Sequence, residues 1–463
     1  MAIRQKKDLG EKLSLFHLTW PIFLEVFLFM LMGIADTFML SAVSDNAVSG
    51  VGAANQYIHI AILILEVVGN GAAIVVSQYL GSRRYIEASK ISGLAVTLNL
   101  GVGIILSIGF VIFSKSIMAG MNLEGEVLEF ANQYLMIVGG GIFLQALINA
   151  LAAIIRVHGY TKQTMFVSLG MNIIHVVGNY ALIFGKFGFP ELGVQGAAIS
   201  SVVSRFIALL VFFWLLYQVM EYRVQVSYYF TISKEYVGKI LKIGLPSAFE
   251  QILYQGCQIV FLYYATYLGA EALAARQYAV NISMFTYLFA VAIGMGTAII
   301  VGRFVGANEK EEAYKSVWYS VKRAFVFTLA MVAVVITFRH PLMSLFTDNE
   351  EIIKIGASVL VLSIILETGR TLNIVIINSL RAAGDATFPV IMGALSMVMM
   401  SVPLGYLFVF VLDMGLPGIW LAIAADEWLR GIIMFFRWKS KKWEKYALVH
   451  EKEENSDLDS QTV

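Results

Sequence analysis

The sequence contains little of what soluble proteins and most enzymes depend on. Only 14% of its 463 residues are charged, whereas soluble domains carry about 25%. The single cysteine, Cys257, excludes an intramolecular disulfide and a cysteine-rich metal site, and in its apolar context we expect a packing residue. Lysine and arginine form no basic block interleaved with aromatic residues, and the net charge is only +1, so no nucleic-acid partner is expected.

Apolar sequence, by contrast, is abundant. Hydrophobic residues make up 59% of the chain, and apolar runs of about 20 residues recur along most of its length, which is typical of transmembrane helices. We therefore predict an all-α polytopic membrane protein. Its twelve expected transmembrane helices are 14–41, 53–80, 94–115, 129–155, 161–185, 192–219, 240–269, 277–302, 323–346, 354–380, 386–412 and 417–438.

The distribution of basic residues predicts the orientation of these helices. The chain begins like a signal peptide, but the apolar run behind the basic start is too long and lacks a small-residue cleavage site, so we expect a retained first helix. Lysine and arginine gather in alternate loops, which places both termini in the cytoplasm and the protein in the cell membrane. The residues that carry this signal are Arg4, Lys6, Lys7, Lys12, Arg83, Arg84, Lys90, Arg156, Lys162, Arg223, Lys234, Lys239, Arg303, Lys310, Lys315, Lys322, Lys439, Lys441, Lys442 and Lys445.

The two halves of the sequence repeat each other without a gap. Pro21 pairs with Pro246 (246 − 21 = 225), and Glu25 pairs with Glu250 at the same shift. The shift also relates Gly69 to Gly294, Gly71 to Gly296, Gly81 to Gly306, Glu87 to Glu312, Ala88 to Ala313, Lys90 to Lys315 and Arg156 to Arg381. Because each half holds an even number of helices, the halves share one orientation, as in two-lobed transporters.

The repeat divides the chain into three predicted parts. Residues 1–225 form an N-terminal lobe of six helices, and residues 226–445 form a C-terminal lobe of six helices. Residues 446–463 are predicted to be a polar cytoplasmic tail, and its segment "HEKEENSDLDSQTV", residues 450–463, is expected to be without fixed structure.

Three stretches carry a family resemblance. They are "WPIFLEVFLFMLMGIADTFML" in the first helix, "IIRVHGYTKQTMFVSLGMNIIHVVGNYALIFGKFGFPELGVQGAA" across the fifth and sixth, and "NSLRAAGDATFP" after the tenth. Over about residues 14–440 the sequence resembles the multidrug and toxic compound extrusion family of cation-coupled efflux transporters. The resemblance implies two six-helix bundles around a cavity that opens to one side at a time. It also implies an antiporter that exports amphipathic, often cationic organic compounds in exchange for H⁺ or Na⁺.

Two acids lie in the first predicted helix. Glu25 and Asp36 share one helix face, about 16 Å apart along the axis. An acid inside a membrane helix is costly and is by default a candidate functional residue. The resemblance implies that Asp36 binds the coupling proton or cation, and the alternative is a structural acid capped by a neighbour. Glu25 is either a transport residue or a repeat-related residue that packs beside the proline.

A polar stripe follows on the fifth predicted helix. Asn172, His175 and Asn179 have i, i+3, i+7 spacing and so share one face. Members of the family often carry an acid where Asn179 stands and an amide where His175 stands, and this chain departs at both positions. We predict that the stripe orients Asp36 by hydrogen bonds, with His175 either a proton relay or a packing residue. Ser201 matches a hydroxyl position of the family.

The second half offers further candidates. Glu250 matches a family acid implicated in cation binding in some members, and Tyr254 and Gln258 continue its helix face. A Na⁺ site at Asp36 or at Glu250 is therefore an open alternative to H⁺ coupling.

Charged groups on the tenth and twelfth predicted helices compensate one another. Some sodium-coupled relatives have an acid where Arg370 stands, and Glu367 is placed to neutralise this arginine, which argues against a second sodium ligand there. Asp426, Glu427 and Arg430 compensate one another in the same way. Arg156 and Arg381 are expected at the cytoplasmic ends of the fourth and tenth helices, where they would anchor the helices at headgroups or close the inner face.

Other classes of protein fit less well. A lipid-linked oligosaccharide flippase on a related fold would usually have more helices and a basic cavity. A major-facilitator transporter would carry an acid-glycine-basic pattern after the second helix, where this chain reads "GSRRYIEASK". No paired histidines, HExxH motif or nucleophile–base spacing predicts an enzyme. We expect no cofactor beyond the coupling ion, small organic compounds and membrane lipids as partners, and a monomer.

Overall fold

The structure is a computed structural model that describes residues 13–121, 123–220 and 222–449, and the regular secondary structure of these residues is entirely helical. The first half contains α1 (Leu15–Ser41), α2 (Asp45–Gly81), α3 (Tyr85–Ala119), α4 (Gly125–Tyr134), η1 (Leu135–Gly139), α5 (Ile142–Val157), α6 (Thr161–Ile183) and α7 (Gly193–Val219). The short α8 (Val226–Phe230) connects the halves.

The second half repeats this order. It contains α9 (Lys234–Thr266), α10 (Ala270–Gly306), α11 (Lys310–Thr337), α12 (Arg339–Ser344), α13 (Glu350–Ala382), α14 (Thr387–Ser396), η2 (Met397–Ser401), α15 (Val402–Tyr406), η3 (Leu407–Val411), α16 (Leu416–Lys439) and η4 (Lys442–Tyr446). When α4–η1–α5 and α14–η3 are each counted as one, the described residues form twelve long helical segments, as the sequence predicts.

Most of these segments are long and apolar enough to span a membrane. Among the described residues, nine helices are long and apolar enough to cross a membrane, or ten when the bent pair Gly125–Gly139 and Ile142–Val157 is counted as one. The two that fall short are α9 and α16, which carry the polar and charged residues of the second half. In α16 these are Asp426, Glu427 and Arg430, and in α9 they include Glu250.

Several predicted helix ends are wrong, because hydropathy stops where a helix leaves the apolar layer but the helix continues to its cap. The helix predicted for 53–80 begins at Asp45. Ser44 is its N-cap, and the Ser44 side chain accepts a hydrogen bond from the backbone N–H of Ala47. The helix predicted for 323–346 begins at Lys310 and ends at Thr337. The fourth helix bends by 46° at the three consecutive glycines that follow Val138.

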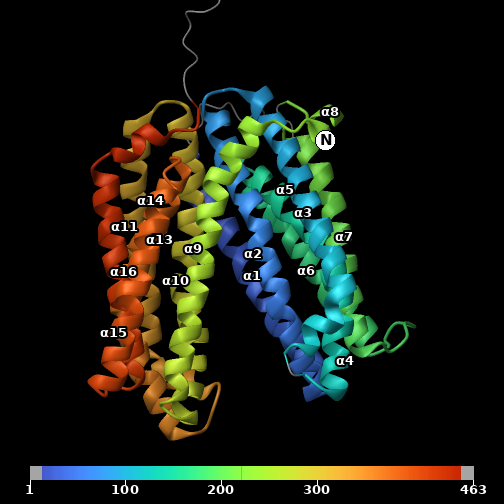
Figure 1. The fold of residues 1–463 in the computed structure, drawn as a ribbon, viewed down its shortest axis with the longest axis vertical. Helices are drawn as coiled ribbons and strands as arrows, with labels where there is room; N and C mark the ends of the chain where they lie inside the picture. The colour runs from blue at the N-terminus through green and yellow to red at the C-terminus, as the bar shows by residue number, and fades with distance from the viewer. Residues whose placement is uncertain (1–12, 122, 221, 450–463) are drawn as a thin grey trace, which may run out of the picture.

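The helices form two bundles. Figure 1 shows α1 to α7 together on one side and α10 to α16 on the other, with the two bundles close together at the upper end and farther apart at the lower end. We call α1–α7 the first lobe and α9–α16 the second lobe. The predicted boundary near residue 225 falls in the linker before α8, and it remains a prediction.

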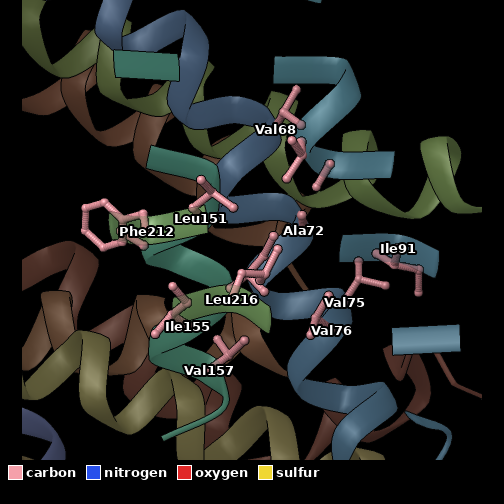
Figure 2. Packing of buried hydrophobic residues seen from close by; sticks show 14 of the residues in the cluster. Val68, Ala72, Val75, Val76, Ile91, Leu151, Ile155, Val157, Phe212 and Leu216 are labelled. Carbon is pink, nitrogen blue, oxygen red and sulfur yellow. The ribbon is translucent and has the colours of Figure 1, made fainter. Parts of the chain in front are cut away.

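Each lobe has its own apolar core. In the first lobe α2, α3, α5 and α7 contribute side chains that pack together, and Figure 2 shows Val75, Leu151, Phe212 and Leu216 among them. Small residues let the helices approach closely, as membrane helices require because lipid offers no hydrophobic driving force between them. A side chain at Gly103, for example, would overlap the backbone of Phe143 on η1–α5.

The lobes touch each other through α1, α2, α9 and α10. Phe23 on α1 stacks on Phe289 of α10 with ring centroids 3.9 Å apart, and Phe27 meets Phe285 at 6.3 Å. Farther along, the ends of α2 and α10 cross at Gly81, where a Cβ would overlap the carbonyl oxygen of Arg303. We call this crossing the closed end of the molecule. It lies at the upper end in Figure 1.

The first residues of the predicted tail pack against the helices. Residues 446–449 read "YALV", and Leu448 is only 3% exposed. The rest of the predicted tail, 450–463, lies outside the described residues.

Candidate functional site

Asp36 lies inside the first lobe with two side chains of α6. His175 Nε2 is 2.7 Å from Asp36 Oδ1, and Asn179 Nδ2 donates to the same oxygen at 2.7 Å. His175 and Asn179 are almost fully buried, whereas the Asp36 side chain is 23% exposed. The predicted contact between α1 and the α6 stripe is therefore present, and the acid at its end is partly exposed.

The contact constrains the histidine tautomer. A carboxylate oxygen accepts hydrogen bonds, so Nε2 of His175 carries the proton whenever Asp36 is ionised. Asn179 Nδ2 lies 3.2 Å from the same Nε2, and both atoms then point a hydrogen at Asp36. The group thus joins two side chains that can exchange a proton, a carboxyl and an imidazole, over one short hydrogen bond.

Two members of the predicted site do not reach Asp36. Both polar atoms of Asn172 are buried, and neither has a hydrogen-bond partner among the described residues. Ser201 donates instead to the carbonyl of Ala197 on its own helix. The helical spacing of the stripe was predicted correctly, but Asn172 lies two turns from Asn179, too far along the axis to share one carboxylate.

The sequence reasoning missed two residues at this site. Arg205 on α7 and Tyr134 on α4 both interact electrostatically with Asp36. Nη1 of Arg205 is buried with no hydrogen-bond partner in the described part of the chain. One signal was available, because Arg205 stands at the repeat shift of 225 from Arg430, which the sequence analysis did consider.

Glu25 forms an ion pair rather than packing against its proline. Arg156 Nη1 lies 3.2 Å from Glu25 Oε1, and Ser168 on α6 donates to the same oxygen at 3.0 Å. Glu66 on α2, which the sequence reasoning also missed, lies in electrostatic range of Arg156. Arg156 therefore ties α5 to α1 inside the lobe, and its predicted role at the cytoplasmic end, headgroup anchoring or closure of the inner face, remains a prediction.

The second lobe repeats this ion pair. Arg381 Nη2 lies 2.6 Å from Glu250 Oε2, and both residues stand at the repeat shift from Arg156 and Glu25. Arg381 therefore ties α13 to α9, and its role at the cytoplasmic end likewise remains a prediction. Arg430 adds a second positive charge 3.9 Å from the other oxygen of Glu250. The acid predicted as a cation ligand is thus enclosed by two arginines.

A larger charge network surrounds this pair in α13 and α16. Arg430 Nη2 lies 3.0 Å from Asp426 and 3.1 Å from Glu427. Arg370 Nη1 lies 2.9 Å from Glu367, and its Nε is 3.5 Å from Glu427. These five side chains are buried, so the predicted pairing of Glu367 with Arg370, and of Arg430 with its two acids, is present, with three carboxylates against two guanidinium groups.

Tyr254 and Gln258 lie on the same helix as Glu250 but interact with different neighbours. Tyr254 is in electrostatic range of Arg370 and Arg430. Gln258 Oε1 accepts a hydrogen bond from Arg276 of α10 at 3.3 Å. Tyr254 therefore borders the charge network, whereas Gln258 connects two helices farther along.

This combination of two helical bundles with buried ionisable groups defines a polytopic membrane transporter. The MatE family model matches residues 21–181 and 246–407, one match in each lobe. The chain therefore belongs to the MatE family, the multidrug and toxic compound extrusion transporters. The two matches begin at Pro21 and Pro246, which are also related by the sequence repeat.

Relatives match over nearly the whole length. The uncharacterized transporter YisQ of Bacillus subtilis is 41% identical over 438 residues, which cover 95% of this chain and 96% of that protein. The probable multidrug resistance protein NorM of Thermotoga maritima is 27% identical over 448 residues, 96% of each chain. A solved MOP superfamily transporter from Pyrococcus furiosus has a TM-score of 0.85 at 22% identity, covering 92% of this chain and 95% of that one, which shows the shared fold.

Proposed function

We propose that this chain is a secondary active antiporter of the cell membrane that exports small amphipathic, often cationic organic compounds in exchange for H⁺ or Na⁺. The similarity to NorM, named a probable multidrug resistance protein, supports the substrate class. The observation that supports coupling is the contact of Asp36 with His175 and Asn179, because it places a proton-binding pair inside a membrane lobe.

Exchange follows from the charge of Asp36. An ionised carboxylate accepts hydrogen bonds from both His175 and Asn179 and attracts an organic cation. Protonation removes the negative charge that attracts the cation, so the cation is released. It also weakens both hydrogen bonds, because hydrogen bonds to an ionised acceptor are about twice as strong as neutral ones. One site cannot favour the proton and the cation at once, so the two are carried in opposite directions.

The surroundings of the acids favour H⁺ over Na⁺. A Na⁺ ion at Asp36 would compete with the N–H groups of His175 and Asn179, whose nitrogens lie 2.7 Å from Oδ1. At Glu250 the ion would compete with Arg381 and Arg430, whose charges repel it. We therefore place the coupling ion in the first lobe and propose that it is a proton.

The closed end is proposed to face the cytoplasm. At that end, Arg83 and Arg84 lie between α2 and α3, Lys162 lies in the first turn of α6, and Lys310 begins α11. By the positive-inside rule this is the cytoplasmic side, and both termini lie there with it. We further propose that the transporter acts as a monomer, with membrane lipids and small organic compounds as its partners and no cofactor.

Transport in liposomes tests the proposal. Purified protein is reconstituted, and export of ethidium or a fluoroquinolone is measured while the pH gradient and the sodium gradient are imposed separately. Asp36→Asn mimics the protonated acid, and we expect it to abolish gradient-driven export while the protein still folds. Glu250→Gln is the matched control and should cost less if H⁺ drives transport, but about as much if Na⁺ binds in the second lobe. Export by Asp36→Asn at the wild-type rate would refute the assignment.

A further inference from the structure

The closed end is built from two interactions that the repeat relates to each other. On α2, Gln78 Nε2 donates to the carbonyl oxygen of Ala382 in the second lobe at 2.7 Å. On α10, Arg303 Nη2 donates to the carbonyl oxygen of Val157 in the first lobe at 2.7 Å. Gln78 and Arg303 are 225 positions apart, as are Val157 and Ala382. Each lobe therefore reaches across to the end of the other with the same element.

The helices come close enough for these bonds because of two glycines, also related by the repeat. A Cβ at Gly306 would overlap the carbonyl oxygen of Gln78, and one at Gly81 would overlap that of Arg303. Gln78 itself is fully buried. The lobes therefore cannot separate at this end without exposing both polar side chains and breaking their hydrogen bonds.

The two halves of this contact differ in one respect. A glutamine side chain has an acceptor as well as donors, whereas an arginine side chain has donors only. Gln78 uses its acceptor, because its Oε1 receives a hydrogen bond of 2.8 Å from the backbone N–H of Leu448. A third segment, residues 440–449 after α16, is thereby joined to the first lobe, and we call this segment the strap.

The strap is attached to the second lobe at its start. Trp443 stacks on Trp438 at the end of α16, with ring centroids 4.2 Å apart and the rings parallel to within 5°. Its Nε1 also donates to the carbonyl oxygen of Trp438 at 3.1 Å. Arg437 pairs with Asp385 at 2.8 Å and donates to Tyr446 Oη at 3.4 Å. The first residues of the strap therefore move with α16.

The end of the strap is buried between the lobes. Leu448 is 3% exposed and belongs to the apolar cluster that contains Leu80 and Val157 of the first lobe. The carbonyl of Tyr446 lies against Gly384, whose φ of +97° and missing side chain leave room for it. A segment fixed to the second lobe thus places a backbone donor on the first lobe and a buried leucine between Gly384 and the apolar cluster that both lobes share.

We propose that the strap is an intramolecular latch that stabilises the conformation in which the closed end is shut. The lobes can part there only if Gln78 releases both Ala382 and Leu448 and if the leucine side chain leaves its site. Alternating access then includes the release of the strap, and a partner or modification that displaces residues 446–449 would raise the fraction of molecules open at this end.

Distance measurements between spin labels test the latch. Lys162 and Thr387 are exposed, lie at the starts of α6 and α14 at the closed end, and are repeat-related. Both are replaced by cysteine in a Cys257→Ser background, and the label distances are recorded in liposomes. A chain that stops after Lys445 lacks the end of the strap, whereas one that stops after Val449 keeps it and is the matched control.

We expect the shorter chain to show at least a ~5-fold higher ratio of open to shut molecules than the control, as the loss of one hydrogen bond and one buried leucine requires. Equal distance distributions in the two truncated chains would overturn the proposal. If the shorter chain does not fold, full-length Leu448→Ala is compared with wild type, and an unchanged distribution there would overturn it as well. The readout is conformation, so the result does not depend on the substrate or the coupling ion.

Discussion

The two lobes share a framework and differ at their centres. In each lobe a glutamate beside the helix proline pairs with an arginine at the end of a later helix, Glu25 with Arg156 and Glu250 with Arg381. The crossing of α2 and α10 is likewise built from repeat-related residues. What the lobes share is therefore the set of contacts that hold helix against helix.

The centres carry different chemistry. In the first lobe the partly exposed Asp36 accepts hydrogen bonds from Asn179, which is always neutral, and from His175, which can be neutral or charged. In the second lobe Arg430 lies between Asp426 and Glu427, and all three are buried. Each of these acids, like Glu367 and Glu250, has an arginine within 4 Å, whereas the charged-pair partner of Asp36 is the titratable His175. This difference suggests a switching lobe and a supporting lobe.

The largest expected difference between the lobes concerns two repeat-related arginines, Arg205 in the first lobe and Arg430 in the second. Arg430→Met leaves Asp426 and Glu427 buried without their main partner, and breaking a buried ion pair costs about 3–5 kcal/mol. Arg205→Met removes a charge that forms no ion pair within 4 Å among the described residues and should lower the stability less. Melting of the two purified variants in detergent measures the difference. Equal losses would contradict the division into a switching and a supporting lobe.

A second prediction compares pH dependence. Burial, with a smaller contribution from nearby Arg303, lowers the pKa of His158 in the loop after α5 to about 4. The unfolded chain binds this proton near pH 6.5, so stability is full above that pH and falls by about 3 kcal/mol as the pH drops to 4. The repeat-related residue is Ala383, so His158→Ala copies the second lobe. Melting curves at pH 7 and pH 5 should differ less for this variant than for wild type.

A third prediction concerns the shared framework. Arg156→Met and Arg381→Met each remove hydrogen bonds to a charged group, worth about 1.5–3 kcal/mol. Glu25 keeps the hydroxyl of Ser168, and Glu250 keeps Arg430, so we expect similar losses in the two lobes. Expression and melting should fall while the pattern of exported compounds stays the same. A change in substrate pattern with normal expression would show that the pairs belong to the transport site.

The smallest expected effect lies at the helix starts. Glu87 and Glu312 are repeat-related, but Glu87 pairs with Arg84 at 2.8 Å, and Glu312 pairs with the exposed Lys315 at 3.2 Å. Burial alone would raise the pKa of Glu87, but the hydrogen bond from Arg84, a backbone hydrogen bond and the charges of Arg84 and Lys90 together outweigh it and lower the pKa. The pair therefore stabilises the protein at neutral pH and is lost in acid. Arg84→Ala should cost under about 1 kcal/mol, and Lys315→Ala less. Melting curves of both variants check the order.

Local rules predicted much of the candidate site. Spacing on one helix placed His175 and Asn179 on a common face, and charge balance within one helix or between neighbours predicted the pairing of Arg370 with Glu367. The missed residues are of another kind. Tyr134 and Arg205 come from helices other than those of Asp36 and the α6 stripe, and which helix faces which is set by packing rather than by spacing.

The sequence by itself determined the membrane location of the helices, their number and the duplication, because hydropathy and a fixed repeat shift are properties of the chain alone. The tertiary structure alone decided which polar groups that are far apart in the sequence meet. Glu25 and Arg156 are 131 residues apart, and Gln78 and Leu448 are 370 apart. Such pairs form because the packed helices bring them together. A polar group buried inside a lobe without a hydrogen-bond partner costs free energy, which favours these pairs.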